Sequence, residues 1–162
     1  MDNPMAGWKV LSSCLKSSGL MKIGLYSKLA RQHIVKMQEE ISQSIIGSSD
    51  LAIKSFRNDV IKSEKEHHKL ILLSPDFHSM STLRDLLFHV QEHQFTMPQL
   101  QKCLNELGLK FCGFEVDGIV QHFKLTNTEA DDPCDLDKWN TYEASNPHSF
   151  AGMYQFWCQK VD

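Results

Sequence analysis

LMKIGLY, at residues 20–26, gives the first indication of the architecture. Apolar side chains dominate this run, and a short apolar run between turn residues is typical of a buried strand in a parallel sheet. The preceding residues, 4–16, favour a helix, because Pro4 suits a first helical turn and apolar side chains follow at helical spacing. Gly19 is expected to end that helix as a left-handed cap. A helix, a glycine turn and a buried strand together indicate an α/β fold.

Two later segments also predict strands, LKFCGFEV at residues 109–116 and FAGMYQFWCQK at residues 150–160. Helical patterns are found at residues 27–47, 51–63, 83–92, 98–107 and 136–144. The expected cap residues are Asp50 for the helix at 51–63, Ser81 or Thr82 for the helix at 83–92, and a Thr96–Gln99 capping box for the helix at 98–107. Asp117 and Gly118 are expected to break the second strand. Residues 69–81 are expected to form a loop or short turn, and residues 126–137 a surface loop.

Composition excludes several classes of function. Of the 162 residues, 41% are hydrophobic and 23% charged, which is typical of a globular domain, and the net charge is −3. Nucleic-acid binding through phosphates needs a clustered basic surface, which the sequence lacks. The longest apolar run, residues 70–73, is far too short to cross a membrane. The protein is therefore expected to be cytoplasmic, with neither nucleic acid nor membrane as a partner.

The five cysteines are scattered and form no C-x-x-C pair, so neither a zinc ribbon nor a redox motif is indicated. Cys112 and Cys158 lie in apolar runs, where a thiol usually behaves as a small hydrophobe. The charged segment SEKEHHK at residues 63–69 has mixed sign, which is typical of a solvated helix face.

Three segments carry a family resemblance: PMAGWKVL followed by GLMKIGLYSKLAR, then RDLLFHVQEHQFTMPQLQKCLNELGLKFCGFEV, then DLDKWNTYEASNPHSFAGMYQFWCQK. Together they resemble the C-terminal half of bacterial class I S-adenosylmethionine-dependent methyltransferases, of the type found beside tetratricopeptide repeats. The resemblance spans nearly the whole chain and is weakest at about residues 45–75. It implies a partial Rossmann-like methyltransferase sheet, with strands five, six and seven at residues 20–26, 109–116 and 150–159.

The resemblance also implies a division of the chain and an arrangement of its strands. Residues 1–27 and 97–162 would belong to the methyltransferase domain, and residues 28–96 would form an inserted helical cap over the substrate pocket. The three strands would lie in the order five, seven, six, with strand seven antiparallel to both neighbours.

The main departure from the family is the cofactor site. Class I methyltransferases hold S-adenosylmethionine with a glycine-rich turn and an acidic residue at the ribose, whereas no G-x-G pattern occurs in this sequence. The cofactor is implied by the resemblance but is not expected to bind this chain alone. Expected partners are the missing N-terminal methyltransferase half, or a second copy of the chain that associates through the unpaired edge of strand 20–26. The methyl acceptor is not indicated.

The candidate site residues lie mainly at residues 83–93. Asp85, His89 and His93 follow one another at four-residue spacing and would share one helix face. The resemblance implies that this helix closes the acceptor pocket, with Arg84 pairing an anionic substrate and a histidine acting as general base. The alternative is an ordinary amphipathic helix with a solvated polar face.

Other interpretations of single residues also stay open. His89 and His93 have metal-ligand spacing, which His78, Cys134 or His148 could complete, but the glutamate of H-E-x-x-H is absent. Tyr26 ends the first strand at the carboxyl edge, where α/β sheets bind ligands, or else packs at the rim. Phe150, Tyr154, Phe156 and Trp157 are expected in the sheet core. Three functions follow: a methyltransferase fragment, a non-enzymatic interaction module that pairs through a sheet edge, and a metal-dependent hydrolase.

Overall fold

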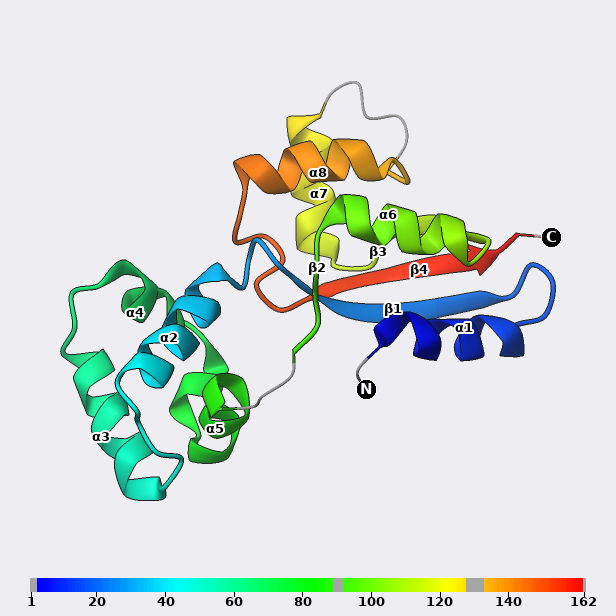
Figure 1. Cartoon of the computed structure of the whole chain (residues 1–162). Coiled ribbons are helices and arrows are strands. Elements are labelled where there is room, and N and C mark those ends of the chain that lie inside the picture. Colours follow the sequence, from blue (N-terminus) through cyan, green and yellow to red (C-terminus); the bar gives the residue numbers. More distant parts are fainter. Residues whose placement is uncertain (1–2, 89–91, 128–132, 162) are drawn as a thin grey trace. The chain divides into compact units, whose positions relative to one another are not determined.

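The computed structural model describes residues 3–88, 92–127 and 133–161, and it has a mixed α/β architecture (Figure 1). The chain divides into two compact units. Met1–Ala30 and His93–Asp162 form the first, which we call the sheet unit, and Arg31–Glu92 form the second, the helical unit. The expected boundaries, 28 and 96, lie within a few residues of these limits, while the assignment of either part to a methyltransferase stays a prediction.

In the described part of the sheet unit, four strands form a sheet in the order β2–β1–β4–β3. Their bounds are Leu20–Ser27 for β1, Gln94–Phe95 for β2, Leu109–Phe114 for β3 and Tyr154–Lys160 for β4. Strand β4 lies between β1 and β3 and is antiparallel to both, which confirms the predicted order and directions of the three longer strands. The two-residue strand β2, which is parallel to β1, was not predicted because it is too short to show a period.

Strand β1 buries only one of its faces. Ile23 is 8% exposed and contributes to the core, whereas Leu20 on the other face is 57% exposed. Lys22, also on the outer face, forms an ion pair of 2.7 Å with Glu115. The expectation of a buried strand in a parallel sheet therefore holds only in part, because β1 pairs along most of its length with the antiparallel β4 and only at its end with the parallel β2. Antiparallel sheets commonly cover one face and leave the other solvated.

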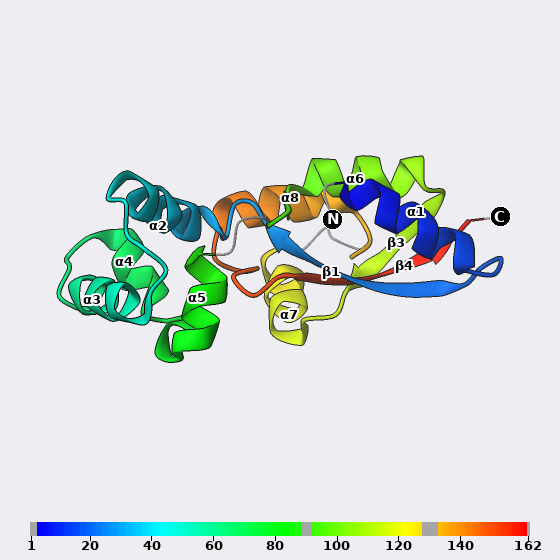
Figure 2. The same ribbon diagram turned by 60° about the horizontal axis from the view of Figure 1, so that its bottom comes forward.

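Four helices accompany the strands in the described part of the sheet unit: α1 (Pro4–Cys14), α6 (Met97–Glu106), α7 (Asp117–Thr126) and α8 (Leu136–Ser145). Helices α1 and α6 lie on the same side of the sheet (Figure 2). The predicted capping box of α6 is confirmed, with Thr96 and Gln99 bonding each other's backbone N–H groups. Strand β3 ends at Phe114, before the break predicted at Asp117 and Gly118. The helix α7 that begins at Asp117 was not predicted, and its Phe123 is completely buried.

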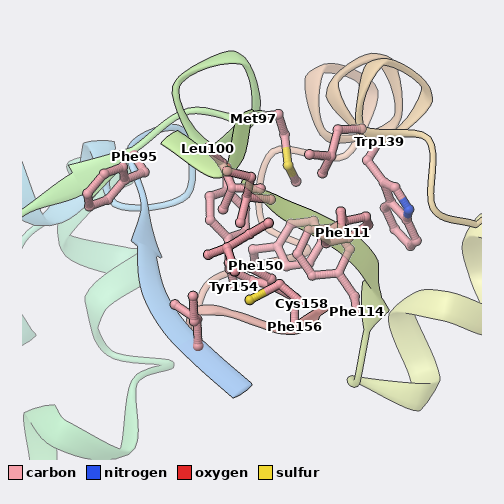
Figure 3. Packing of buried hydrophobic residues seen from close by; sticks show 14 of the residues in the cluster. Phe95, Met97, Leu100, Phe111, Phe114, Trp139, Phe150, Tyr154, Phe156 and Cys158 are labelled. Carbon is pink, nitrogen blue, oxygen red and sulfur yellow. The ribbon is translucent and has the colours of Figure 1, made fainter. Parts of the chain in front are cut away.

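The core of the sheet unit is predominantly aromatic (Figure 3). The ring of Phe114 lies 4.7 Å from that of Phe150 and 4.9 Å from that of Trp139. Phe150, Tyr154 and Phe156 are at most 1% exposed, which confirms them as core residues. The same prediction was wrong for Trp157, which is 40% exposed because alternate residues of β4 point to opposite faces.

Two backbone turns differ from or add to the expectations. The left-handed residue after α1 is Ser18, with φ 57°, and Gly19 is not left-handed. A Cβ atom at Gly19 would lie 2.8 Å from the carbonyl oxygen of Lys16, so a close approach explains this glycine. Gly113 has φ 115° where the register of β3 against β4 shifts, which is the usual place of glycine in a bulge.

The helical unit contains α2 (Gln32–Gln43), α3 (Asp50–Ile61), α4 (Glu66–Ile71), the 3₁₀ turn η1 (Pro75–His78) and α5 (Met80–Phe88). Their apolar faces share a separate core, which includes Met37, Ile53 and Leu83. Within the described residues, no helix is both long and apolar enough to cross a membrane.

Three local predictions for the helical unit were wrong, one of them only in part. Ser49, and not Asp50, caps α3, because its side chain accepts the N–H of Ala52. The loop or short turn expected at 69–81 includes the 3₁₀ turn η1, but it also contains the end of α4 and the start of α5. Helix α5 begins at Met80, before either of its predicted caps. Short helices whose stability comes from packing give little periodic signal.

Candidate functional site

Three polar side chains meet in the interior of the sheet unit at the carboxyl end of β1. The Ser27 hydroxyl donates a hydrogen bond to Glu143 Oε1 over 2.6 Å. The Tyr154 hydroxyl lies 2.7 Å from both carboxylate oxygens of Glu143 and donates to them. We call this group the Glu143 cluster. Ser27 Oγ also accepts the backbone N–H of Ala30 over 3.0 Å, so the hydroxyl is held on both sides.

The topology of the sheet brings these residues together. Ser27 is the last residue of β1 and Tyr154 the first of β4, and because the two strands are antiparallel these ends are neighbours. Glu143 comes from the last turn of α8, four residues after the buried Trp139, so both side chains are on the same helix face. Hydrogen bonds thereby join the end of β1, the start of β4 and the end of α8.

Burial determines the electrostatics of the Glu143 cluster. Glu143 is 3% exposed, and Ser27 and Tyr154 are completely buried. Burial raises the pKa of Glu143 above its ordinary value, because desolvation outweighs the hydrogen bonds from Ser27 and Tyr154. Burial and the neighbouring carboxylate also raise the pKa of Tyr154, so its phenol stays protonated. The direct effect of the cluster is to fix the carboxyl end of β1 through the hydrogen bonds that Ser27 and Tyr154 donate to Glu143.

The sequence did not single out Ser27 or Glu143. A serine after an apolar strand and a glutamate in a short helix are both common at surfaces. The spacing of Glu143 from Trp139 was the one available signal, because it indicates a carboxylate on the buried face of a helix.

Tyr26 lies where it was expected, at the carboxyl end of β1. It is half-buried and is the residue of β1 that faces Gln94 of β2. Its predicted role in ligand binding stays a prediction.

The residues predicted at 83–93 are not arranged as one helical stripe. Arg84 and Asp85 lie on α5 in the helical unit, where Asp85 is exposed and Arg84 forms an ion pair with Asp50. The described part of α5 ends at Phe88, and His89 lies outside the described residues. His93 is exposed and non-helical, because the chain is already extended just before β2.

The residues considered as further metal ligands do not belong to one unit. His78 is part of η1 in the helical unit, whereas Cys134 and His148 belong to the sheet unit. Among the described residues, one different group has the composition and spacing of a metal site, namely Glu40, His67 and His68. This group was not predicted, because SEKEHHK is typical of a solvated helix face and because Glu40 lies far from it in the chain.

All five cysteines are free thiols, and Cys158 is completely buried. Burial raises the pKa of Cys158 to about 11, so this thiol is a protonated core residue at neutral pH.

A search with models of known protein families found no match to this chain.

Proposed function

We propose that these 162 residues form the substrate-side half of a class I S-adenosylmethionine-dependent methyltransferase domain. The proposal includes a cofactor-binding half, with its glycine-rich turn, that is supplied from outside these residues. One observation carries it: the order β1–β4–β3, with the last strand of the chain between the other two and antiparallel to both. The resemblance implies this arrangement for strands five, seven and six.

The outer edge of β1 supports the same proposal. In a complete class I sheet, strand four would lie parallel to strand five on the side away from strand seven. Among the described residues, the strand on that side of β1 is β2, which is parallel but pairs only with Tyr26 and Ser27. The length Leu20 to Leu25 is therefore available to a fourth long strand.

The place of the helical unit in the chain supports its role as a cap. The chain enters this unit at Arg31, shortly after β1 ends, and leaves it at Glu92, shortly before β2 begins. Ligands of open α/β sheets bind at the carboxyl ends of the strands, and both connections are at that end of β1. Tyr26 is our candidate for contacting the methyl acceptor, and His89 and His93 are candidates for removing its proton. An anionic acceptor would have to displace Asp50 from Arg84.

A second function, association through strand pairing without catalysis, is favoured by the same open edge. Exposed edges with unpaired backbone groups readily pair with other chains. The partner in this case would be a second copy of the chain or another protein. The two proposals differ in whether S-adenosylmethionine binds to the assembled complex.

The test is a titration with S-adenosylmethionine by isothermal calorimetry. The chain is expressed alone and together with the polypeptide encoded directly upstream of its reading frame. We expect no measurable binding to the chain alone, because it has no glycine-rich turn. We expect binding to the co-purified complex, since the missing strands complete the sheet.

The upstream polypeptide alone is the matched control. Binding of the cofactor to the chain alone with a micromolar dissociation constant would contradict the proposal. The absence of a glycine-rich turn in the upstream sequence, or a complex that forms without binding the cofactor, would favour the second function.

A further inference from the structure

In the helical unit, a carboxylate lies beside two consecutive histidines that follow it by 27 and 28 residues in the chain. Glu40 is in α2, and His67 and His68 are in the first turn of α4. The Nε2 atom of His67 lies 2.9 Å from Glu40 Oε1, and the Nε2 atom of His68 lies 2.7 Å from Glu40 Oε2. The two imidazole rings are 4.5 Å apart and nearly perpendicular.

These three side chains offer a compact set of ligand atoms. One nitrogen from each histidine and one oxygen from Glu40 lie within 4.8 Å of one another. Two imidazoles and a carboxylate are a ligand set of open zinc sites, in which a fourth position holds water. Tetrahedral bonds of about 2.0–2.1 Å require ligand atoms about 3.3 Å apart. The separations of 2.9 and 2.7 Å between each histidine nitrogen and its carboxylate oxygen would therefore widen slightly around a bound ion.

The exposure of the group allows an ion to enter. The side chain of His68 is 7% exposed, those of His67 and Glu40 are 17% and 26% exposed, and the ligand atoms are therefore partly desolvated without being sealed. His68 Nδ1 is buried and has no hydrogen-bond partner in the described structure, so the contact with Glu40 orients this ring through Nε2 alone.

The ammonium group of Lys65 forms an ion pair with the same Glu40 carboxylate. Its nitrogen lies 2.7 Å from Glu40 Oε1, and the lysine side chain is 57% exposed. Exposed ion pairs of this kind contribute little to stability. A divalent cation can therefore displace the ammonium into solvent and gain two nitrogen ligands that Lys65 does not use.

We propose that Glu40, His67 and His68 bind a zinc ion that links α2 to α4. The site is independent of the methyltransferase proposal, because its residues all belong to the helical unit. Helix α4 has six residues, which is too few for a helix to be stable by itself. The ion would hold this short helix against α2.

The test uses the full chain without an affinity tag, first treated with a chelator and then titrated with zinc chloride by isothermal calorimetry. We expect one zinc ion per chain and a rise in the melting temperature of the helical unit. Cobalt(II) absorption, with tetrahedral d–d bands and no thiolate charge-transfer band, separates this site from the cysteines.

His67→Gln is the principal variant, because His67 is more exposed than His68 and its loss disturbs the core less. We expect at least about 100-fold weaker zinc binding, since even the loss of an outer partner of a metal ligand weakens binding by about 10–100-fold. The matched control is His78→Gln, an exposed histidine of the same unit, which should bind zinc unchanged.

Lys65→Met separates a metal site from a purely structural ion-pair cluster. Removal of the competing ammonium should tighten zinc binding while leaving both histidines in place. Zinc binding that is absent from the chain, unchanged in His67→Gln, or weakened in Lys65→Met would overturn the proposal.

Discussion

Glu143 is the residue that most directly fixes the position of the C-terminal end of β1. The hydroxyl groups of Ser27 in β1 and Tyr154 in β4 both donate hydrogen bonds to the Glu143 carboxylate. None of the three side chains is more than 3% exposed. A buried hydroxyl without its acceptor carries the full cost of its desolvation. The loss of Glu143 therefore destabilises the sheet unit because it leaves the hydroxyls of Ser27 and Tyr154 without an acceptor.

We expect Glu143→Leu to lower the free energy of unfolding of the sheet unit by about 2–4 kcal/mol, because Ser27 and Tyr154 lose their acceptor. Glu143→Gln keeps an acceptor oxygen and should cost less than about 1 kcal/mol. Urea unfolding followed by tryptophan fluorescence measures both, since Trp8, Trp139 and Trp157 all lie in this unit. An equal loss in the two variants would contradict the hydrogen-bond explanation.

Because the pKa of Glu143 is raised, the difference in stability between Glu143→Gln and the wild-type chain depends on pH. A carboxyl whose pKa is raised on folding contributes stability below its ordinary pKa, and that contribution is lost as the pH rises through the folded pKa. The wild-type chain then carries the cost of a buried charge that Glu143→Gln avoids. The stability of Glu143→Gln relative to wild type should therefore increase from acidic to neutral pH.

Glu40 has the opposite behaviour. Burial alone would raise the pKa of Glu40, but hydrogen bonds from Lys65, His68 and His67 outweigh it and lower the pKa to about 2. The stability that Glu40 contributes is therefore present above its ordinary pKa of 4.5 and is lost as the pH falls from there towards about 2.

In the metal-free chain, we expect Glu40→Gln to destabilise the helical unit by about 1–3 kcal/mol at neutral pH. The difference from wild type should persist to about pH 5 and then shrink as the pH falls, because wild-type Glu40 becomes protonated. Far-UV circular dichroism during urea unfolding records the helices of both units, and tryptophan fluorescence records the sheet unit separately, because all three tryptophans lie there. Glu64→Gln is the control, because Glu64 is an exposed partner of Lys69. A difference that stays constant down to about pH 3 would contradict the lowered pKa.

At the scale of elements, the outer edge of β1 has a defined set of exposed backbone groups. The carbonyl oxygen of Gly19 accepts a hydrogen bond from the N–H of Lys160 in β4, so it points towards β4. The N–H of Lys28 donates to the carbonyl oxygen of Phe95 in β2, so it points the other way. Backbone groups alternate in direction along a strand, so those of Leu20, Lys22 and Gly24 point away from β4. Ile23, by contrast, points its side chain into the core.

This geometry identifies the substitution that tests association through β1. Ile23→Lys, which the apolar sequence of the strand suggests, would place a charge in the core. Lys22→Pro instead removes an outward N–H from an exposed position, where an edge strand tolerates proline. If the edge drives self-association, sedimentation velocity should show less dimer for Lys22→Pro than for wild type. Equal association of Lys22→Pro and wild type would contradict this role of the edge.

The sequence allowed prediction of the elements that carry their own local signals. The three long strands are apolar or aromatic runs, and the Thr96–Gln99 capping box was readable because both of its partners are three residues apart. Strand β2 and helix α7 were missed for different reasons. Two residues are too few to show a period, and the Asp117–Gly118 pair signals a break although an aspartate also favours a helix start.

The two polar clusters show why site residues were harder to predict than strands. Ser27 and Glu143 are separated by 116 residues, and Glu40 and His68 by 28. Each pair depends on tertiary packing, which no spacing in the sequence encodes. Conversely, the four-residue spacing of His89 and His93 suggested a shared face, yet His93 is not helical.

At the scale of the whole molecule, the helical unit is inserted into the chain of the sheet unit between two connecting segments that lie side by side. Lys28 N bonds Phe95 O over 2.9 Å, so the two connecting segments are adjacent where they leave the sheet unit. Within the helical unit, the guanidinium of Arg31 likewise bonds the carboxylate of Glu92. Each unit thus has its two connections held together by its own contacts.

We therefore expect the sheet unit to fold without the helical unit. Residues 31–92 would be replaced by a linker of about four glycine and serine residues, each of which spans up to about 3.5 Å. Near-UV circular dichroism should retain the signal of the aromatic core, and urea unfolding should stay cooperative. The full-length chain is the control, and loss of the near-UV signal would show that the sheet unit depends on the helical unit.

The small size of β2 hides a constraint on any strand that is added to this sheet. Because β2 already occupies the edge beside Tyr26 and Ser27, an incoming strand must stop there and can pair only with the six residues before them. A slip of one residue would turn every side chain of the added strand to the opposite face. Strand β2 would thus limit any strand that pairs with this edge to the six residues from Leu20 to Leu25.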